Sequence, residues 1–197
     1  MGKEVYMFTK EYWKSSADKL RSTKYLAIMA ATIAMKIALS YISIPISESL
    51  RINFGYLVTS IEGAVLGPVA GAVSGMVTDL VGFMIHPTGP FFIGYTLTAM
   101  LGPFVYGLFF YRKRITLPRI ALSKVFVNLF VNVLVGSLWS AILYSKGYIY
   151  YAGRSLIKNV SMLPIEIVLL YTMFRLVGPY LEHRKLIVPQ KPAEKKD

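Results

Sequence analysis

Charged residues inside otherwise apolar segments are the first candidates for chemistry in this sequence. They are Lys36, Asp79, Lys124, Glu166 and Arg175. An unpaired charge in hydrocarbon costs several kcal/mol, so each requires a partner or a route to water. We expect Lys124 and Arg175, near predicted helix ends, to snorkel toward water. Lys36, Asp79 and Glu166 lie deeper, and we expect each either to contact a ligand or to form an ion pair between helices, such as Asp79 with Lys36.

A second group of polar residues lies at the ends of the apolar segments. Its cations are Arg51, Lys146, Arg154 and Lys158, with His86 nearby and Glu48 as the main acid. These cations can either contact lipid headgroups or attract an anionic ligand. The surrounding aromatic side chains form an interfacial belt or stack on a flat ring. They are Phe54, Tyr56, Phe91, Phe92, Tyr95, Trp139, Tyr144, Tyr148, Tyr150 and Tyr151.

Two regular patterns predict faces on helices. Lys124, Asn128 and Asn132 recur every four residues, and this polar stripe must face protein or a water-filled cavity. We expect it to form interhelical hydrogen bonds. The second pattern is a stripe of small side chains at Ala27, Ala31, Ala34 and Ala38, which suits close packing against another helix, either internal or in another subunit.

Composition limits the functions that the chain can have. Of its 197 residues, 55% are hydrophobic and 16% are charged, as in a membrane-embedded protein. The net charge of +12 is concentrated beside the apolar segments, so we expect contact with lipid rather than nucleic acid. The absence of cysteine excludes disulfides and thiolate metal sites. GxxxxGK[ST], HExxH and GxSxG motifs are missing, and we expect no catalytic activity, metal or cofactor.

The apolar segments predict six membrane-spanning helices. Residues 55–84 would form a single helix about 45 Å long, whereas the hydrocarbon core is roughly 30 Å thick. We therefore expect the chain to fold back at Gly67-Pro68, where glycine accepts a turn and proline disfavours helix in its predecessor. The predicted spans are residues 25–44, 56–66, 69–84, 93–111, 120–143 and 155–178.

The distribution of Lys and Arg predicts the orientation of these spans. With six spans, the three basic segments lie on one side, which the positive-inside rule makes cytoplasmic. They are the N-terminal tail, residues 112–119 and the C-terminal tail. We therefore predict an all-α membrane protein, a bundle of six transmembrane helices with both termini cytoplasmic. Residues 1–24 form a cytoplasmic or interfacial tail, 25–179 the substrate-binding domain, and 180–197 a basic cytoplasmic tail.

Residues 49–114 closely resemble the substrate-binding (S) components of energy-coupling factor (ECF) transporters, most of all their folate-specific branch. The motifs are an Arg and aromatic segment at Arg51 and Phe54, a GPxxGxxxG turn over 67–75, and Asp-Leu-Val-Gly over 79–82. A Pro-x-Gly-Pro loop over 87–90 and an aromatic, glycine-rich span over 91–106 complete the pattern. Such proteins lie in the bacterial plasma membrane.

The resemblance implies a six-helix vitamin binder that docks on a membrane coupling subunit and two ATPases and tips over in the membrane to release its solute inward. It also implies that Ala27, Ala31, Ala34 and Ala38 contact the coupling subunit. Folate offers a hydrogen-bonding edge, a flat face and carboxylates. The expected substrate-binding residues are Arg51, Asn53, Phe54, Asp79, His86, Phe91, Phe92, Tyr95, Trp139, Arg154 and Lys158.

Other functions remain open at this point. The same fold could bind riboflavin, thiamine or another heterocyclic vitamin. A membrane enzyme, a channel or a secondary carrier that works alone is a different class of protein, although no inverted repeat is evident in the sequence.

Overall fold

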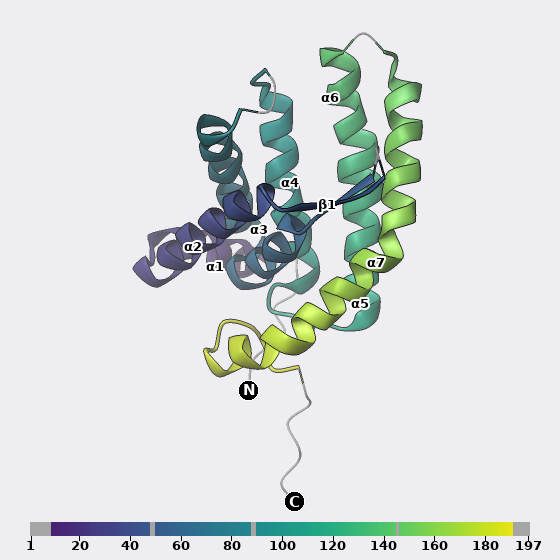
Figure 1. Ribbon diagram of the computed structural model, residues 1–197. Coiled ribbons are helices and arrows are strands. Elements are labelled where there is room, and N and C mark those ends of the chain that lie inside the picture. Colours follow the sequence, from purple (N-terminus) through teal and green to yellow (C-terminus); the bar gives the residue numbers. More distant parts are fainter. Residues whose placement is uncertain (1–8, 48–49, 88–89, 145, 191–197) are drawn as a thin grey trace, which may run out of the picture.

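The computed structural model describes residues 9–47, 50–87, 90–144 and 146–190, with the backbone alone described for 43–47 and 50–52 (Figure 1). The first part contains α1 (Lys10–Ala17), a 3₁₀ turn η1 (Asp18–Arg21), α2 (Thr23–Ser40), strands β1 (Ser43–Ser47) and β2 (Leu50–Asn53), α3 (Gly55–Ile85) and α4 (Ile93–Phe110). The second contains α5 (Leu117–Phe126), a π-helix η2 (Val127–Val135), α6 (Gly136–Leu143) and α7 (Tyr148–His183).

Five helical segments are long and apolar enough to cross a membrane. They are α2, α3, α4, the continuous helix Leu117–Leu143 and α7. The chain is therefore an all-α membrane protein, in which the antiparallel pair β1 and β2 is a small addition that the sequence did not predict.

The long helix α3 is broken at Gly67, which has a φ of +81°. The break separates a first arm (residues 55–66) from a second arm (68–85). Ser74 on the second arm donates a hydrogen bond to Glu62 on the first. In a straight helix these residues would be about 18 Å apart along the axis, so the chain folds back between them. The predicted break at Gly67-Pro68 is confirmed.

The N-terminal segment caps both ends of this break. Ser16 Oγ donates to the carbonyl of Leu66 at 2.9 Å and accepts from the backbone N–H groups of Val69 and Ala70 at 3.0 and 3.2 Å. Lys19 Nζ donates to the carbonyl of Val65. Helix ends leave such groups without partners, and buried ones must be satisfied from elsewhere. Residues 10–21 therefore pack against the break in α3.

Lys19 should make the stability of this cap dependent on pH. Burial, helped by the charges of Arg112 and Lys24, lowers the pKa of Lys19 from 10.5 to about 7. Between pH 7 and pH 10.5 the unfolded chain therefore binds more protons than the folded chain. The free energy of unfolding rises with pH by up to about 1.4 kcal/mol per pH unit, and this stabilisation is lost as the pH falls toward 7. The melting temperature of the wild type minus that of Lys19→Met should increase from pH 7 to pH 9. A constant difference would contradict this.

The helices form two halves, α1–α4 and α5–α7 (Figure 1). A shared apolar cluster joins the halves, and it includes Ala64, Tyr106, Phe110, Val131 and Leu170. These residues come from α3, α4, η2 and α7. Because Phe110 ends α4 just before the basic segment 112–119, the cluster lies toward the cytoplasmic side.

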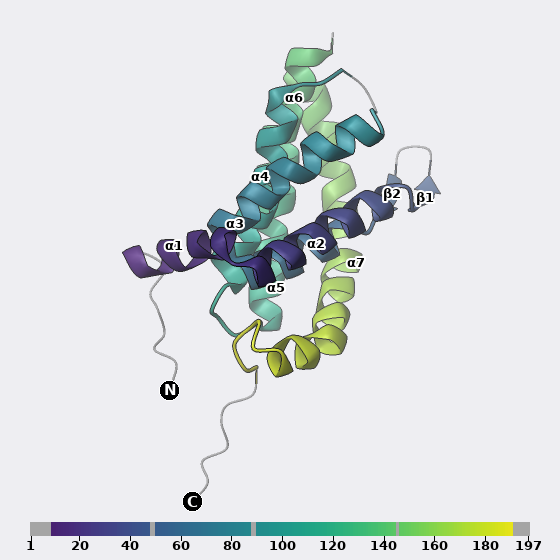
Figure 2. The ribbon, with the colours of Figure 1, turned by 90° about the vertical axis from the view of Figure 1, so that its left-hand side faces the viewer.

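Both ends of the described chain lie at this same side of the molecule. Leu20, which follows α1, packs in one cluster with Leu66 from the break in α3 and with Leu181 and Leu186 from the end of the chain. Figure 2 shows the end of α7 on the same side of the bundle as the start of α5. This arrangement agrees with the orientation predicted from the basic residues.

Candidate ligand-binding site

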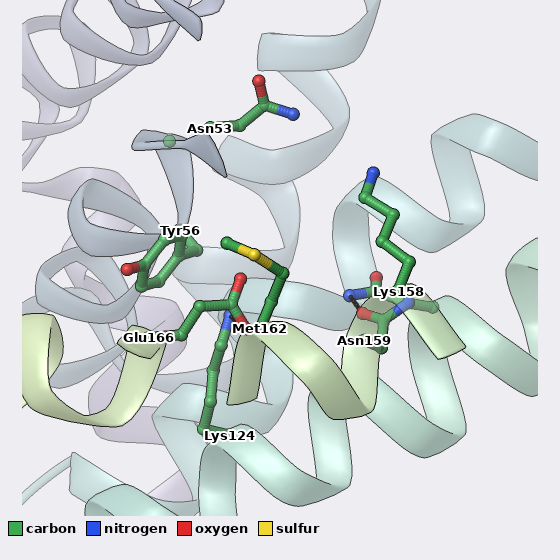
Figure 3. A pocket seen from close by; sticks show the side chains of 9 residues that line it. Asn53, Tyr56, Lys124, Lys158, Asn159, Met162 and Glu166 are labelled. Carbon is green, nitrogen blue, oxygen red and sulfur yellow. Dashed lines mark hydrogen bonds and ion pairs between the residues drawn. The ribbon is translucent and has the colours of Figure 1, made fainter. Parts of the chain in front are cut away.

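Two adjoining cavities lie between the halves. The inner chamber, about 190 Å³, is lined by Asn53, Gly55, Tyr56, Lys124, Asn132, Lys158, Asn159, Met162 and Glu166 (Figure 3). The outer chamber, about 650 Å³, is lined by Tyr95, Asn132, Gly136, Ser137, Ser140, Tyr151, Arg154, Ser155, Ile157 and Lys158. Asn132 and Lys158 border both chambers, so the two can hold parts of one elongated ligand.

A buried ion pair closes the inner chamber from below. Lys124 is only 2% exposed, and its Nζ lies 3.1 Å from Glu166 Oε2 and 3.8 Å from the centroid of the Tyr56 ring. Asn128 Nδ2 donates to the same Glu166 oxygen at 2.7 Å. The expectation that Lys124 snorkels toward water is therefore wrong, because its charge is compensated inside the protein by a carboxylate and an aromatic face.

The polar stripe on the fifth predicted span connects η2 to α7. Asn132 Nδ2 donates to the side-chain oxygens of Asn128 and Asn159 at 3.4 and 3.2 Å, and Asn128 Nδ2 lies 3.3 Å from the carbonyl oxygen of Asn159. The predicted interhelical hydrogen bonds are confirmed. Asn128 and Asn132 of this stripe lie in the π-helix η2, a geometry often found at functional sites, and Lys124 lies at the end of α5. Lys124 and Asn132 of the stripe also line the chambers. The four-residue spacing predicted that the stripe faces either protein or a cavity, and it did not distinguish between the two.

The outer chamber has a cationic wall. Arg154 is exposed and Lys158 half-buried, and the described residues that line this chamber include no carboxylate. Ser137 Oγ is buried without a hydrogen-bond partner in the described part of the chain. A cavity of this kind attracts an anion and offers hydroxyl groups to it.

The structure brings some of the predicted substrate-binding residues together. Asn53 and Lys158 line the inner chamber, and Tyr95, Arg154 and Lys158 line the outer one. Next to them, the rings of Phe92 and Trp139 lie 5.7 Å apart, and Phe92 also contacts the ring of Tyr95. Trp139 Nε1 donates to Thr98 at 3.0 Å, which fixes the indole beside the outer chamber.

Three other predicted residues do not line either chamber, namely Asp79, His86 and Phe91. The hydroxyl of Thr96 donates to Asp79 at 2.7 Å, the His86 ring packs on Tyr41, and the Phe91 ring packs on Phe83. Two further candidates lie near the start of α3. Phe54 precedes the helix directly, and the side chain of Arg51 lies outside the described residues.

The expected substrate-binding residues omitted several residues that line the inner chamber, although Glu166 was considered as a ligand contact and Tyr56 as a stacking ring. They are Tyr56, Lys124, Asn132, Asn159, Met162 and Glu166. The polar stripe and the deep position of Glu166 were the available signals. Both fitted a structural role equally well, because spacing does not reveal which neighbouring helix a side chain faces.

The pairing of Asp79 with Lys36 is wrong, because Lys36 binds Glu62 instead. Lys36 Nζ lies 2.6 Å from Glu62 Oε2. The other oxygen of this fully buried carboxylate accepts from Thr32 at 3.0 Å and from Ser74. This cluster of Thr32, Lys36, Glu62 and Ser74 ties α2 to both arms of α3. Glu62 therefore has a structural role, and it does not line either chamber.

The alanine stripe of α2 faces away from the rest of the protein. Ala27, Ala31, Ala34 and Ala38 are exposed, whereas Met29, Thr32 and Lys36 on the opposite face are buried. Packing of the stripe against another helix within the described part of the chain is therefore contradicted. The stripe is a flat surface that is open to lipid or to another protein.

Comparison with known proteins gives consistent relatives. The chain is 30% identical over 159 residues to the folate transporter FolT of Clostridium novyi (strain NT), which covers 80% of this chain and 92% of that protein. It is 24% identical over 155 residues to FolT of Leuconostoc mesenteroides, covering 76% and 83%. A crystal structure of FolT bound with folic acid has a TM-score of 0.69 at 29% identity, covering 77% of this chain and 94% of that one.

A family model also matches most of the chain. The model described as the S component of an ECF-type riboflavin transporter matches residues 19–176. This range extends from the 3₁₀ turn η1 to well within α7, so it includes the break in α3 and both chambers. The chain therefore belongs to the ECF-type S-component family that this model describes.

Proposed function

We propose that this chain binds folate from outside the cell and delivers it inward as the S component of an ATP-driven ECF importer. The relatives that carry the name folate transporter, and a similar structure that holds folic acid, support this choice of vitamin. In this proposal the chain captures the ligand without covalent chemistry, and its partners supply ATP hydrolysis. The sequence lacks the phosphate-binding motif that an ATPase would require.

The observation that carries the proposal is the difference in chemistry between the two chambers. The inner chamber is small and contains an internally neutralised ion pair, which suits a flat, uncharged ring with a polar edge. The outer chamber is larger and contains Arg154 and Lys158, which suit carboxylates. Folate has this same polarity, with a pterin ring at one end and a glutamate at the other.

Calorimetry on the purified chain tests the choice of vitamin. Folate, riboflavin and thiamine should be compared in the same detergent, because the family description names riboflavin while the curated relatives are folate transporters. We expect folate to bind most tightly by at least an order of magnitude. Tighter binding of riboflavin or thiamine would assign the chain to another vitamin.

Reconstitution tests the dependence on partners. Proteoliposomes that contain this chain alone should bind folate but accumulate none, whereas addition of the coupling subunit, both ATPases and ATP should start uptake. Concentrative uptake by the chain alone would instead identify a secondary carrier.

Removal of the Lys158 charge should weaken the capture of folate. Lys158 borders both chambers, and a charged hydrogen bond contributes about 1.5 to 3 kcal/mol, so Lys158→Gln should raise the dissociation constant about 10- to 150-fold. Lys146→Gln is the matched control, since Lys146 is exposed and contacts Tyr150 outside the chambers. Equal effects of the two substitutions would show that only the general positive charge matters.

A further inference from the structure

Glu166 presents one free carboxylate oxygen to the inner chamber. Its Oε2 is occupied by Lys124 and Asn128, at 3.1 and 2.7 Å. Its Oε1 has no hydrogen-bond partner in the part of the chain that the structure describes. Figure 3 shows one oxygen of Glu166 next to the Lys124 nitrogen and the other directed away from it, toward the space below Asn53.

The environment of Glu166 restricts what the free oxygen can do. Oε2 of Glu166 forms an ion pair with Lys124 and accepts a hydrogen bond from Asn128. An ionised carboxylate accepts hydrogen bonds and donates none. A ligand that reaches Oε1 must therefore bring an N–H or O–H group to it, and a carbonyl oxygen at the same place would be repelled.

We propose that Glu166 selects the ligand by the donor groups on the edge of its ring. The proposal rests on the function proposed above and assigns a role within the same site. A 2-amino-4-oxopteridine ring, as in folate, has two adjacent donors on one edge, the ring N3–H and the 2-amino group. The corresponding edge of a flavin has one N–H between two carbonyl oxygens. In this proposal Oε1 of Glu166 accepts from the 2-amino group of the pterin, and a flavin would present a carbonyl oxygen at the same place.

The donor groups on the ring edge also distinguish the vitamins that proteins of this fold could bind. A buried acceptor left without a donor carries the full cost of its lost hydration, so a site built for a donor discriminates strongly against a ligand that lacks it. The small size of the inner chamber adds to this effect, because water has little room to mediate between two acceptors. Glu166 accordingly favours pterins over flavins.

Two ligands that differ at one position provide the test. One is folic acid, and the other is the analogue in which oxygen replaces the 2-amino group. The wild-type chain should bind folic acid about 10- to 150-fold more tightly than the analogue, the range expected for a charged hydrogen bond. Glu166→Gln should reduce this preference to a few-fold, because an amide can both donate and accept. Calorimetry measures both affinities for each variant.

The informative quantity is the preference, which is the ratio of the affinities of one variant for folic acid and for the analogue. Misfolded protein lowers the bound fraction of both ligands equally and leaves the ratio unchanged. Lys158→Gln is the matched control and should weaken both ligands while keeping the preference. If Glu166→Gln fails to fold because Lys124 loses its counter-charge, the double variant Lys124→Gln/Glu166→Gln removes both charges and should show the same reduced preference.

The outcomes separate the two proposals. A wild-type preference that persists in Glu166→Gln, or in the double variant, would overturn the role of Glu166 while leaving folate binding intact. Equal binding of the two ligands by the wild type would overturn it as well. Failure of the wild type to bind either pteroyl compound would instead overturn the proposed function.

Discussion

Replacement of Glu62 by alanine is expected to lower the free energy of unfolding by about 3 to 5 kcal/mol, the usual cost of removing one partner from a buried ion pair. Lys36 would keep a buried charge without a counter-charge. The hydroxyl groups of Thr32 and Ser74 would also lose the acceptor that they share. Because this cluster joins α2 to both arms of α3, the loss should affect the folding of the whole first half.

Thermal melting in detergent measures this effect, with Asp79→Ala as the control. Asp79 is a carboxylate on the second arm of α3, half-buried and bonded to Thr96 without a cation partner in the structure as described. Its removal should lower the melting temperature much less. The double variant Lys36→Met/Glu62→Met should recover most of the loss, since it leaves no stranded charge. Similar melting of Glu62→Ala and wild type would exclude a stabilising role for the pair.

A tryptophan at Ala31 should abolish ATP-dependent folate uptake while leaving folate binding by the isolated chain unchanged. Ala31 lies in the exposed stripe of α2, and small side chains let helices approach closely in lipid. A bulky side chain would hold a partner helix away from this face. The opposite face of α2 carries Thr32 and Lys36, which hold the helix in place whatever occurs at the stripe.

Leu26→Trp provides the matched control for Ala31→Trp. Leu26 is exposed on the same helix but lies to one side of the stripe. Uptake by reconstituted complexes and the amount of co-purified coupling subunit should fall for Ala31→Trp alone. Normal uptake by Ala31→Trp would place the docking surface elsewhere on the protein.

The fold was predictable where local chemistry determines it. Gly67 and Pro68 identify the break in α3, because one residue accepts a positive φ and the other interrupts helix in the residue before it. The helix preceding the basic segment 112–119 was also recognised. The sixth span was predicted to begin at residue 155, whereas α7 begins at Tyr148, and polar residues such as Tyr150 and Arg154 interrupt the apolar pattern in its first turns. No local signal predicted the π-helix η2.

The site was predictable only in part, because helix rotation and long-range packing determine it. Asp79 and Glu166 are both acids within apolar segments, yet only Glu166 faces the chambers. The partner of Lys36 is Glu62, which lies 26 residues further along the chain. The position of Glu62 inside an apolar run gives no indication that α2 packs against the first arm of α3. Lys158 and Arg154 were identified because cations at helix ends are rare on the outer side.

The capped break in α3 has a consequence for how the protein is made. The first arm, residues 55–66, would extend about 18 Å as a helix, well short of the roughly 30 Å hydrocarbon core. It must therefore enter the bilayer together with the second arm. Ser16 and Lys19, which complete the broken ends, precede both arms in the chain. The ribosome synthesises the N-terminal segment first, so the capping groups already exist when the hairpin emerges.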